Sequence, residues 1–356
     1  MKNNLRFFRL EFWLFMAILA ISFIISCTQK EDKLLPIDSV KIETLTTDSI
    51  SIRAITLMGS NLGFAGNKGQ YGLYDAQKNM VKTNIKKQDT LLPNFRSVAS
   101  TRNDFFMLSI QNPALLYKTG DTGEMELVYK EENEKVFYDA MTFWNDQEGI
   151  AMGDPTEECL SVIITRDGGK SWTKISCDKL PEVAKGEAAF AASDTNIAII
   201  GDHTWILTGG IKSRVFYSAD KGETWEVFET PLVQGKETTG GYSIDFYEDK
   251  TGFIIGGDYT KVDDNSKNKA ITADGGRTWQ LISEASGPGY QSCVQFVPGR
   301  NGQQLVSVGK TGIWVSNNTG KDWEQLSETG FYTLRFLNDS VAYAGGNNIL
   351  AKLHFK

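Results

Sequence analysis

Arginines, carboxylates and tyrosines at recurring positions of the sequence could together bind or act on an anionic ligand. Arginine can donate two parallel hydrogen bonds to a carboxylate, and two carboxyl groups can serve as general acid and base. The candidate ligand site consists of Arg53, Arg96, Asp139, Asp154, Glu187, Asp202, His203, Arg214, Tyr242, Asp258 and Tyr332. Within this set, Asp139, Glu187 and Tyr242 are the candidates for catalysis, because they could supply an acid, a base or a nucleophile.

Other kinds of chemistry have weaker support in the sequence. The only two histidines are His203 and His354, too few for a histidine-rich metal site, and no nucleophile elbow accompanies His203. The acidic stretch 263–265 lacks the spacing of a calcium loop. Because no glycine-rich dinucleotide loop opens a helix either, we expect neither a metal nor a cofactor.

The candidate residues are far apart in the chain, so a repeated fold has to gather them. After residue 27, short β-rich runs alternate with turns rich in Gly, Asp and Asn, which indicates an all-β protein. Inner strands of repeated units are expected to begin near Ser51, Phe95, Phe137, Glu187, Tyr242, Gln291 and Phe331. Their spacing fits the roughly 40 to 50 residues of a four-stranded antiparallel blade, so seven starts predict a seven-bladed β-propeller. A β-sandwich or an eight-bladed ring is the alternative.

Strand direction predicts which residues meet at one end of such a ring. The starts of inner strands and the turns between second and third strands belong to the same face, the top mouth. The first group supplies Arg53, Arg96, Asp139, Glu187, Tyr242, Ser292 and Tyr332, and the second supplies Asp154, Asp202, His203 and Asp258, followed by Tyr259. Arg214 opens a third strand nearby. The alternative for each residue is a solvated side chain or a cap on neighbouring backbone.

The last blade is short of one strand. Only three strands fit after Phe331, and Val40–Thr46 is expected to supply the fourth. Pairing the first strand with the last one closes the ring and removes an exposed sheet edge.

The N-terminal segment has the features of an export signal. Basic residues are followed by an apolar run of 14 residues from Phe12 to Ile25, too short to span a bilayer. Residues 24–27 resemble the lipobox of bacterial lipoproteins, which implies a lipidated Cys27; an ordinary signal peptide is the alternative. We expect a signal peptide over 1–26, a tether over 27–38 and the propeller over 39–356. This organisation places the protein in the cell envelope, anchored in the outer membrane or at the cell surface.

Two further cysteines flank one predicted hairpin. Cys159 and Cys177 lie at equal distances from its turn, so they are expected on adjacent strands and within reach of a disulfide, which export favours. Two buried thiols are the alternative. Cys293 is expected to be a lone thiol on an inner strand.

Four segments share the pattern Ser/Thr-x-Asp-x-Gly-x-Thr-Trp or a close variant: Thr165–Trp172, Ser218–Trp225, Thr272–Trp279 and Ser316–Trp323. The pattern resembles the Asp-box of sialidases and related propellers, in which Asp and Gly shape a tight hairpin rather than catalyse. The segments Trp144–Gly153, Ile164–Trp172 and Gly186–Ser193 resemble propellers related to the photosystem II stability/assembly factors. That resemblance implies accessory binding to partner proteins.

These observations favour a recognition or assembly module that binds a polar ligand or a partner segment at the mouth. The alternative is a sialidase-like hydrolase or lyase that acts on anionic glycans. A net charge of −7 and the lack of a basic stripe argue against nucleic acid as a partner. The expected partners are the membrane, through Cys27, and a protein or glycan, and we expect a monomer.

Overall fold

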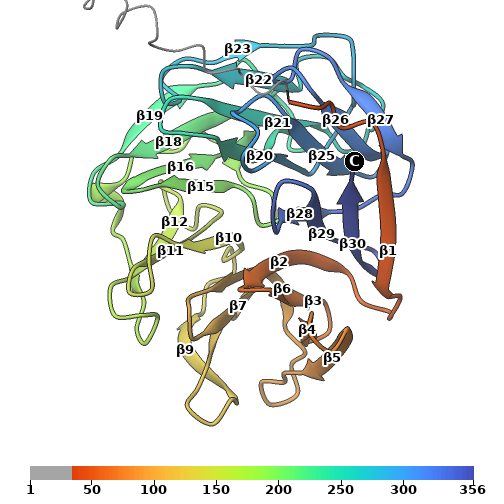
Figure 1. Ribbon diagram of the computed structural model, residues 1–356. Helices are drawn as coiled ribbons and strands as arrows, with labels where there is room; N and C mark the ends of the chain where they lie inside the picture. Colours follow the sequence, from red (N-terminus) through yellow and green to blue (C-terminus); the bar gives the residue numbers. More distant parts are fainter. Residues whose placement is uncertain (1–33) are drawn as a thin grey trace, which may run out of the picture. The chain divides into compact units, whose positions relative to one another are not determined.

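The computed structural model describes residues 34–356, and residues 37–356 form a compact unit. The predicted signal peptide, the lipidation site Cys27 and the first part of the tether lie outside the described residues. Seven antiparallel sheets stand around a common centre as the blades of a β-propeller (Figure 1). The seven-bladed all-β fold predicted from the sequence is confirmed. Among residues 34–356, no helix has the length and apolar character needed to cross a bilayer.

Each of the first four blades is a meander whose strands run outward from the centre in chain order. The first blade comprises β2 (Ile52–Met58), β3 (Asn61–Gly66), β4 (Gln70–Asp75) and β5 (Met80–Ile85). The second comprises β6 (Asn94–Ser100), β7 (Phe105–Ile110), β8 (Ala114–Thr119) and β9 (Met125–Glu131). The third comprises β10 (Tyr138–Phe143), β11 (Gly149–Gly153), β12 (Ser161–Thr165) and β13 (Thr173–Lys174). The fourth comprises β15 (Ile197–Ile200), β16 (His203–Leu207), β18 (Arg214–Ser218) and β19 (Glu226–Glu229).

The remaining blades include an enlarged sheet and the closure of the ring. The fifth blade comprises β20 (Thr239–Phe246), β21 (Gly252–Asp258), β22 (Lys269–Thr272) and β23 (Gln280–Leu281), extended inward by β17 (Gly209–Gly210) and β14 (Glu187–Ala188). The sixth comprises β24 (Cys293–Phe296), β25 (Leu305–Gly309), β26 (Gly312–Ser316) and β27 (Glu324–Ser327). The seventh comprises β28 (Thr333–Phe336), β29 (Val341–Gly346), β30 (Ile349–Phe355) and β1 (Val40–Thr46). The N-terminal strand therefore completes the last blade, as predicted.

Burial along a blade follows the distance of each strand from solvent. The second strands β7 and β11 are buried along their whole length, because each blade packs between two neighbours. The outer strand β5 is mostly exposed and carries polar residues. Apolar clusters fill the spaces between adjacent blades, such as the cluster that joins Phe106 and Leu108 of the second blade to Met141, Ile163 and Trp172 of the third.

Four tight turns between third and fourth strands share one hydrogen-bond pattern. In the first turn, the Asp167 carboxylate accepts hydrogen bonds from the Ser171 amide (3.0 Å), the Ser171 hydroxyl (2.7 Å) and the Thr165 hydroxyl (2.9 Å). Gly169 has a φ of 76°, and a Cβ there would lie 2.2 Å from the Phe106 ring. Asp220 and Asp274 organise two equivalent turns in the same way. In the fourth turn, the Asn318 side-chain oxygen accepts a hydrogen bond from the Asp322 amide, and its NH2 group donates one to the Asp322 carboxylate. These side chains therefore shape hairpins.

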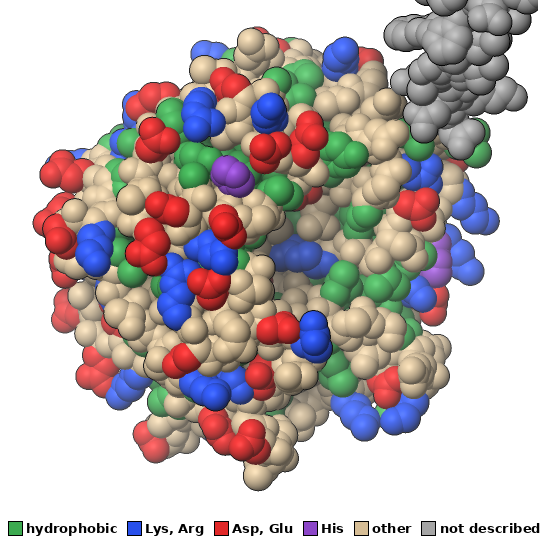
Figure 2. Space-filling model, turned by 60° about the vertical axis from the view of Figure 1, so that its left-hand side comes forward, with side chains coloured by type: hydrophobic (Ala, Val, Ile, Leu, Met, Phe, Trp, Pro, Cys, Tyr) green, Lys and Arg blue, Asp and Glu red, His purple; other side chains and the backbone are tan. Residues whose placement is uncertain are grey.

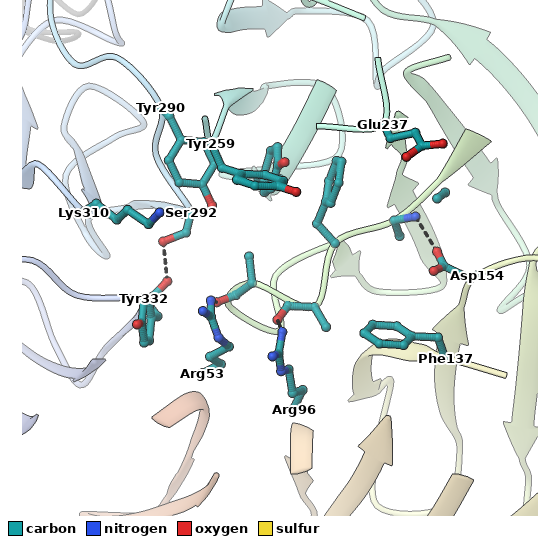
Figure 3. Close-up of a pocket in the computed structure, with 16 residues that line it drawn as sticks. Arg53, Arg96, Phe137, Asp154, Glu237, Tyr259, Tyr290, Ser292, Lys310 and Tyr332 are labelled. Atoms are coloured by element: carbon teal, nitrogen blue, oxygen red, sulfur yellow. Dashed lines mark hydrogen bonds between the residues drawn. The ribbon is translucent and has the colours of Figure 1, made fainter. Parts of the chain in front are cut away.

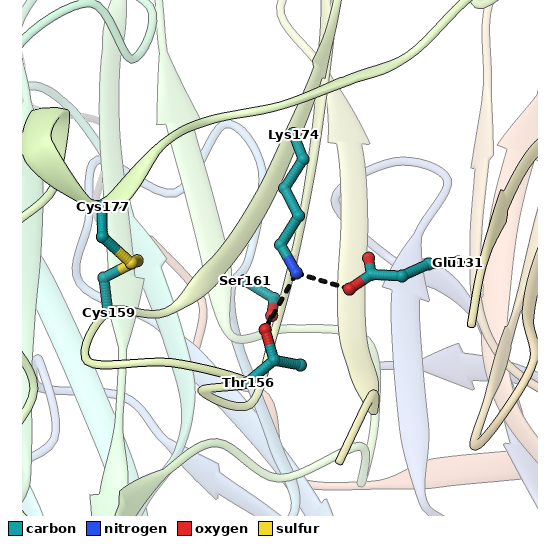
Figure 4. Close-up of a disulfide and its surroundings, with 6 residues drawn as sticks. All are labelled: Glu131, Thr156, Cys159, Ser161, Lys174 and Cys177. Atoms are coloured by element: carbon teal, nitrogen blue, oxygen red, sulfur yellow. Dashed lines mark hydrogen bonds and ion pairs between the residues drawn. A yellow bond between two sulfur atoms is a disulfide. The ribbon is translucent and has the colours of Figure 1, made fainter. Parts of the chain in front are cut away.

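A disulfide joins Cys159 to Cys177, as predicted (Figure 4). Both residues lie just outside the paired parts of β12 and β13, and Cys177 begins the short 3-10 helix η1 (Cys177–Lys179). Cys293 is a buried free thiol on the inner strand β24, also as predicted. In the same region, Lys174 contacts Glu131 of the second blade and Thr156 of its own blade (Figure 4). This contact ties the two blades together near their outer strands.

Residues 188–196, which we call the channel segment, connect the third blade to the fourth in the chain. They contact the inner strands of several blades. The Asp194 carboxylate accepts hydrogen bonds from the amides of Val98 (3.0 Å) and Met141 (2.9 Å) in the second and third blades. The Thr195 carbonyl accepts one from the Ile244 amide (2.9 Å) in the fifth blade. The Ser193 carbonyl accepts one from the Thr333 hydroxyl (2.8 Å) in the seventh. Only a segment on the propeller axis can reach all of these strands.

Candidate functional site

A cavity of about 510 Å³ opens above the channel segment at the top mouth (Figure 3). Its side chains come from six blades and from the channel segment itself. The polar and aromatic lining residues are Arg53, Arg96, Phe137, Asp154, Phe190, Glu237, Tyr242, Tyr259, Tyr290, Ser292, Lys310 and Tyr332. The cavity therefore brings together five residues of the predicted ligand-binding set, Arg53, Arg96, Asp154, Tyr242 and Tyr332, together with Ser292 and Tyr259.

β-Bulges place several of these side chains at the mouth. In β2, Ile52 pairs with Gly66 and Ala54 with Ala65, so that Arg53 is the extra residue. The same irregularity occurs at Arg96 in β6, Asp139 in β10 and Tyr242 in β20. A bulge redirects the side chain of the extra residue out of the regular alternation of a strand. Three of these four bulges therefore direct a side chain into the cavity, namely Arg53, Arg96 and Tyr242.

The two arginines form the cationic base of the cavity. Arg53 donates a hydrogen bond to the Ala192 carbonyl (3.4 Å) and Arg96 donates one to the Ala191 carbonyl (3.2 Å). Arg53 also stacks over the Tyr332 ring, with 3.9 Å between the guanidinium carbon and the ring centre. Burial, and then the charge of Arg53, lower the pKa of Arg96 to about 10. Within residues 34–356, neither arginine forms an ion pair with a carboxylate.

Burial raises the pKa of two carboxyl groups near the arginines. Asp154 accepts a hydrogen bond from the Ala189 amide (2.8 Å), and burial raises its pKa to about 6. Asp139 is fully buried behind the cavity; burial and then Asp154 raise its pKa well above the ordinary value, while Arg96 opposes the shift. Asp139 therefore does not line the cavity, and its position does not match that of an acid in contact with a ligand.

An aromatic wall borders the cavity at the fifth to seventh blades. Phe190 of the channel segment stacks parallel to Tyr242 at 3.9 Å between ring centres, and Tyr290 packs edge-on against Tyr242 at 4.8 Å. The Tyr242 hydroxyl donates a hydrogen bond to the Thr238 carbonyl (2.9 Å), and burial raises its pKa. Burial therefore disfavours the phenolate form that a tyrosine nucleophile requires.

A second, smaller cavity of about 230 Å³ lies below the channel segment, at the opposite end of the channel. We call it the lower chamber. Its single cation, Arg335, donates hydrogen bonds to the carbonyls of Asp194 (2.9 Å) and Leu334 (2.8 Å) and lies 3.9 Å from an Asp194 carboxylate oxygen. Burial raises the pKa of Asp194 to about 8 and that of Asp245 to about 7, and Arg335 opposes both shifts. Figure 2 shows Lys or Arg colour deep in the central hollow of the face that it draws.

The prediction that an inner strand begins near Glu187 was wrong. The fourth inner strand begins at Ile197, because the channel segment is inserted before it. Glu187 lies in β14, with its side chain fully buried in an ion pair with Arg214 (2.5 Å). It also accepts hydrogen bonds from the Thr208 hydroxyl (2.6 Å) and the Ala184 amide (2.8 Å). Glu187 and Arg214 therefore neutralise each other outside the mouth, and Glu187 is not placed to catalyse there.

The same shift of register displaced two other predicted site residues. Asp202 and His203 lie at the turn between β15 and β16, which belongs to the face opposite the mouth. There the Asp202 carbonyl accepts a hydrogen bond from the Lys221 amide, and His203 Nδ1 lies 2.6 Å from the Tyr217 hydroxyl. Asp258 is on the correct face but lines a separate small cavity, where Thr260 binds its carboxylate.

Sequence reasoning missed five of the polar and aromatic residues that line the mouth: Phe137, Phe190, Glu237, Tyr290 and Lys310. Lys310 lies in the turn between β25 and β26, the second and third strands of the sixth blade. The rule that such turns belong to the top mouth predicted Asp154, and it would also have predicted Lys310. Phe190 had no such signal, because only the folded structure brings the channel segment to the axis. Residues 34–356 contain no cluster of three or more His, Cys, Asp or Glu side chains that could hold a metal ion.

Solved structures with the same fold span most of the chain at low sequence identity. The structure described as YCF48 bound to D1 peptide matches with a TM-score of 0.62 and 13% identity, covering 89% of this chain and 97% of that one. YCF48 from Cyanidioschyzon merolae matches with a TM-score of 0.62 and 10% identity, covering 89% and 99%. A GH74 xyloglucanase from Xanthomonas campestris matches with a TM-score of 0.60 and 12% identity, covering 89% of this chain but 53% of the enzyme.

Sequence comparison gives a partial match. The family model Sortilin-Vps10 (Sortilin, neurotensin receptor 3) matches residues 160–294, which correspond to part of the ring. No curated protein matches the sequence. The structural similarities establish the propeller fold, and they leave the function to be argued from the site.

Proposed function

We propose that this protein is an exported, lipid-anchored recognition propeller whose mouth binds an acidic segment of a partner protein. The observation that carries the proposal is the pair Arg53 and Arg96, two neighbouring guanidinium groups that face a cavity and form no ion pair with a carboxylate among residues 34–356. Like charges held close together in a partly buried site are stabilised when an anion joins them.

The geometry leaves donors available for such an anion. Arg53 and Arg96 each use one terminal nitrogen on a backbone carbonyl, so other N–H groups of each guanidinium are left for a ligand. Lys310 adds a third positive charge at the edge of the cavity (Figure 3). A cavity of about 510 Å³ has room for a few side chains of an extended segment. The structure of YCF48 bound to D1 peptide supports a peptide as the class of ligand, since that propeller has the same fold.

The N-terminal sequence supports the anchor in this proposal. The short apolar run and the lipobox-like residues 24–27 are typical of exported lipoproteins, and residues 28–36 would give the propeller some reach from the membrane. In cells fed a labelled fatty acid, the protein should incorporate label, and the Cys27→Ser variant should not. Equal labelling of both proteins would contradict the anchor without affecting the proposal for the mouth.

A peptide-binding experiment tests the function of the mouth. We expect fluorescent glutamate-containing peptides to bind the purified full-length protein, and their glutamine counterparts to bind much more weakly. The Arg53→Ala/Arg96→Ala variant should weaken binding of the acidic peptides by about 30-fold or more, because charge-assisted hydrogen bonds are lost. A matched control is Arg102→Ala/Arg277→Ala, which removes the same charge from exposed turns of the opposite face. Equal weakening by both variants, or acidic binding that survives the first, would contradict the proposal.

Hydrolysis of anionic glycans is the second candidate function, and Asp154 is the observation that favours it. A carboxyl group whose pKa is raised to about 6 and which lines a cavity can act as a general acid near neutral pH. Glu237 lines the same cavity and could serve as its partner. Release of reducing sugar from acidic polysaccharides that stops in Asp154→Asn would support this function. Turnover unaffected by that substitution would exclude Asp154 as the acid.

A further inference from the structure

The aromatic wall of the mouth carries information about the ligand beyond its charge. Six aromatic residues line the cavity together with the two arginines. Phe190, Tyr242 and Tyr290 hold one another in place by a parallel stack and an edge-on contact, so this part of the wall is fixed before a ligand arrives. Tyr259, on the loop after β21, remains 42% exposed at the rim. Fixed rings beside an opening favour ligands that themselves present a ring.

Tyr290 provides a second observation that points to a ligand. Its side chain is 5% exposed, and its ring is covered by Tyr242, yet it borders the cavity. Among residues 34–356, its hydroxyl has no hydrogen-bond partner, in contrast to the hydroxyl of Tyr242. The hydroxyl oxygen reaches the open cavity, and burial of the residue raises the pKa of Tyr290, which keeps the hydroxyl protonated. It can therefore donate a hydrogen bond to an acceptor within the cavity.

The arrangement of charges decides which side of the cavity an acidic group occupies. Figure 3 shows Tyr290, Lys310 and Tyr332 on one side, the two arginines at the base, and Asp154 and Glu237 on the other side. An acidic group is repelled by Asp154 and Glu237 and attracted to the side of Arg53, Lys310 and Tyr290. Its immediate neighbour in a ligand then lies against the aromatic wall.

We infer that the mouth selects an acidic group that directly adjoins an aromatic ring, namely a glutamate or aspartate next to a phenylalanine, tyrosine or tryptophan in the partner segment. The inference rests on the proposed function and names the sequence feature that the same site recognises. The arginines take the carboxylate, the Tyr290 hydroxyl donates an additional hydrogen bond to it, and the ring packs on Phe190 and Tyr259.

Three labelled peptides of equal charge test this selectivity against the full-length protein. Each is a blocked glycine pentapeptide with one central glutamate that is followed by phenylalanine, leucine or alanine. The phenylalanine peptide should bind about three- to tenfold more tightly than the leucine peptide, because a ring gains energy from stacked aromatic partners beyond its apolar area. The alanine peptide should bind most weakly.

Substitutions in the aromatic wall test whether it causes the preference for the phenylalanine peptide. Tyr290→Phe keeps the ring and should weaken all three peptides by about tenfold, while Phe190→Leu should reduce the preference for phenylalanine over leucine. Tyr247→Phe is the matched control, since Tyr247 is exposed and distant from the mouth; it should change nothing. Thermal unfolding of each variant shows whether its fold is retained.

The outcomes separate this inference from the proposed function. Equal affinity for the phenylalanine and leucine peptides, with binding still dependent on Arg53 and Arg96, would overturn the aromatic selectivity and leave the acidic-segment proposal standing. Binding unaffected by Tyr290→Phe would remove the hydroxyl from the site. If no glutamate peptide binds, both the proposed function and the inference are overturned.

Discussion

The two ends of the propeller channel are built from the same inner strands and differ in how their charges are balanced. In the lower chamber, Arg335 lies among carbonyl groups and beside the carboxyl groups of Asp194 and Asp245. At the mouth, Arg53 and Arg96 face each other's charge and an open cavity. The channel segment separates the two ends and contacts both.

This difference is the reason why we propose ligand binding at the mouth and not in the lower chamber. The charges of the lower chamber are met by groups of the protein itself, so adding a ligand there would displace existing contacts. At the mouth, Arg53 and Arg96 form no ion pair with a carboxylate of residues 34–356. The Tyr290 hydroxyl has no hydrogen-bond partner among the same residues. Under the proposed function, the same blade architecture has a structural role at one end and a binding role at the other, and side-chain chemistry distinguishes the two ends.

The largest expected effect of a single substitution at constant pH is that of an arginine, and it compares one arginine from each end. Arg335→Ala should lower the free energy of unfolding by about 3 kcal/mol, because the buried carbonyls of Asp194 and Leu334 lose their charged hydrogen-bond donor. Arg96→Ala should change it by less than about 1 kcal/mol, since it also removes repulsion from Arg53. Urea unfolding followed by tryptophan fluorescence measures both. Similar losses for the two variants would break the distinction between the ends.

Removal of the Asp194 carboxylate should have the next largest effect. Asp194→Ala leaves the amides of Val98 and Met141 without their acceptor, at an expected cost of about 2 kcal/mol in the free energy of unfolding. The control is Asp202→Ala, an acidic side chain that is 67% exposed and whose contact with Lys221 is a surface ion pair. Equal destabilisation by Asp202→Ala would contradict the role of Asp194 in holding the channel segment against the inner strands.

The lower chamber also predicts a dependence of stability on pH. Because the pKa of Asp194 is about 8 in the folded protein, against an ordinary value of 3.8, the folded state binds an extra proton between these pH values. Stability from this group is complete below pH 4 and is lost as the pH rises to about 8, by up to about 1.4 kcal/mol per pH unit. Asp194→Asn should flatten that decline in urea titrations at pH 5 to 9. A parallel decline in both proteins would contradict the assignment.

The smallest expected effect concerns the affinity of the mouth. Asp154, with a pKa of about 6, is an anion above that pH and neutral below it. Affinity for a glutamate peptide should therefore rise about threefold as the pH falls from 7.5 to 5.5, because repulsion of the ligand disappears while its carboxylate stays ionised. Asp154→Asn should bind with the higher affinity at both pH values. An unchanged pH dependence in this variant would assign the effect to another group.

Sequence periodicity predicted most of the fold because each blade repeats a local pattern. Six of the seven inner strands begin within three residues of their predicted positions, and the N-terminal strand closes the ring as expected. The fourth inner strand was misplaced because residues 188–196 carry strand-like composition but form the channel segment at the axis. That one error moved Glu187, Asp202 and His203 into the predicted mouth, although none of them lines it.

What the sequence determined by itself is the set of local features: turn residues, apolar strands, the spacing of the blades and the inner-strand positions that carry Arg53, Arg96 and Tyr242. Each depends on contacts between residues close in the chain or on a repeat. Only the tertiary structure decided that Phe190 and Tyr290 stand beside the arginines, and that Glu187 is neutralised by Arg214. The physical reason is that burial and ion pairing depend on neighbours brought together by ring closure and by the channel segment, which no local pattern records.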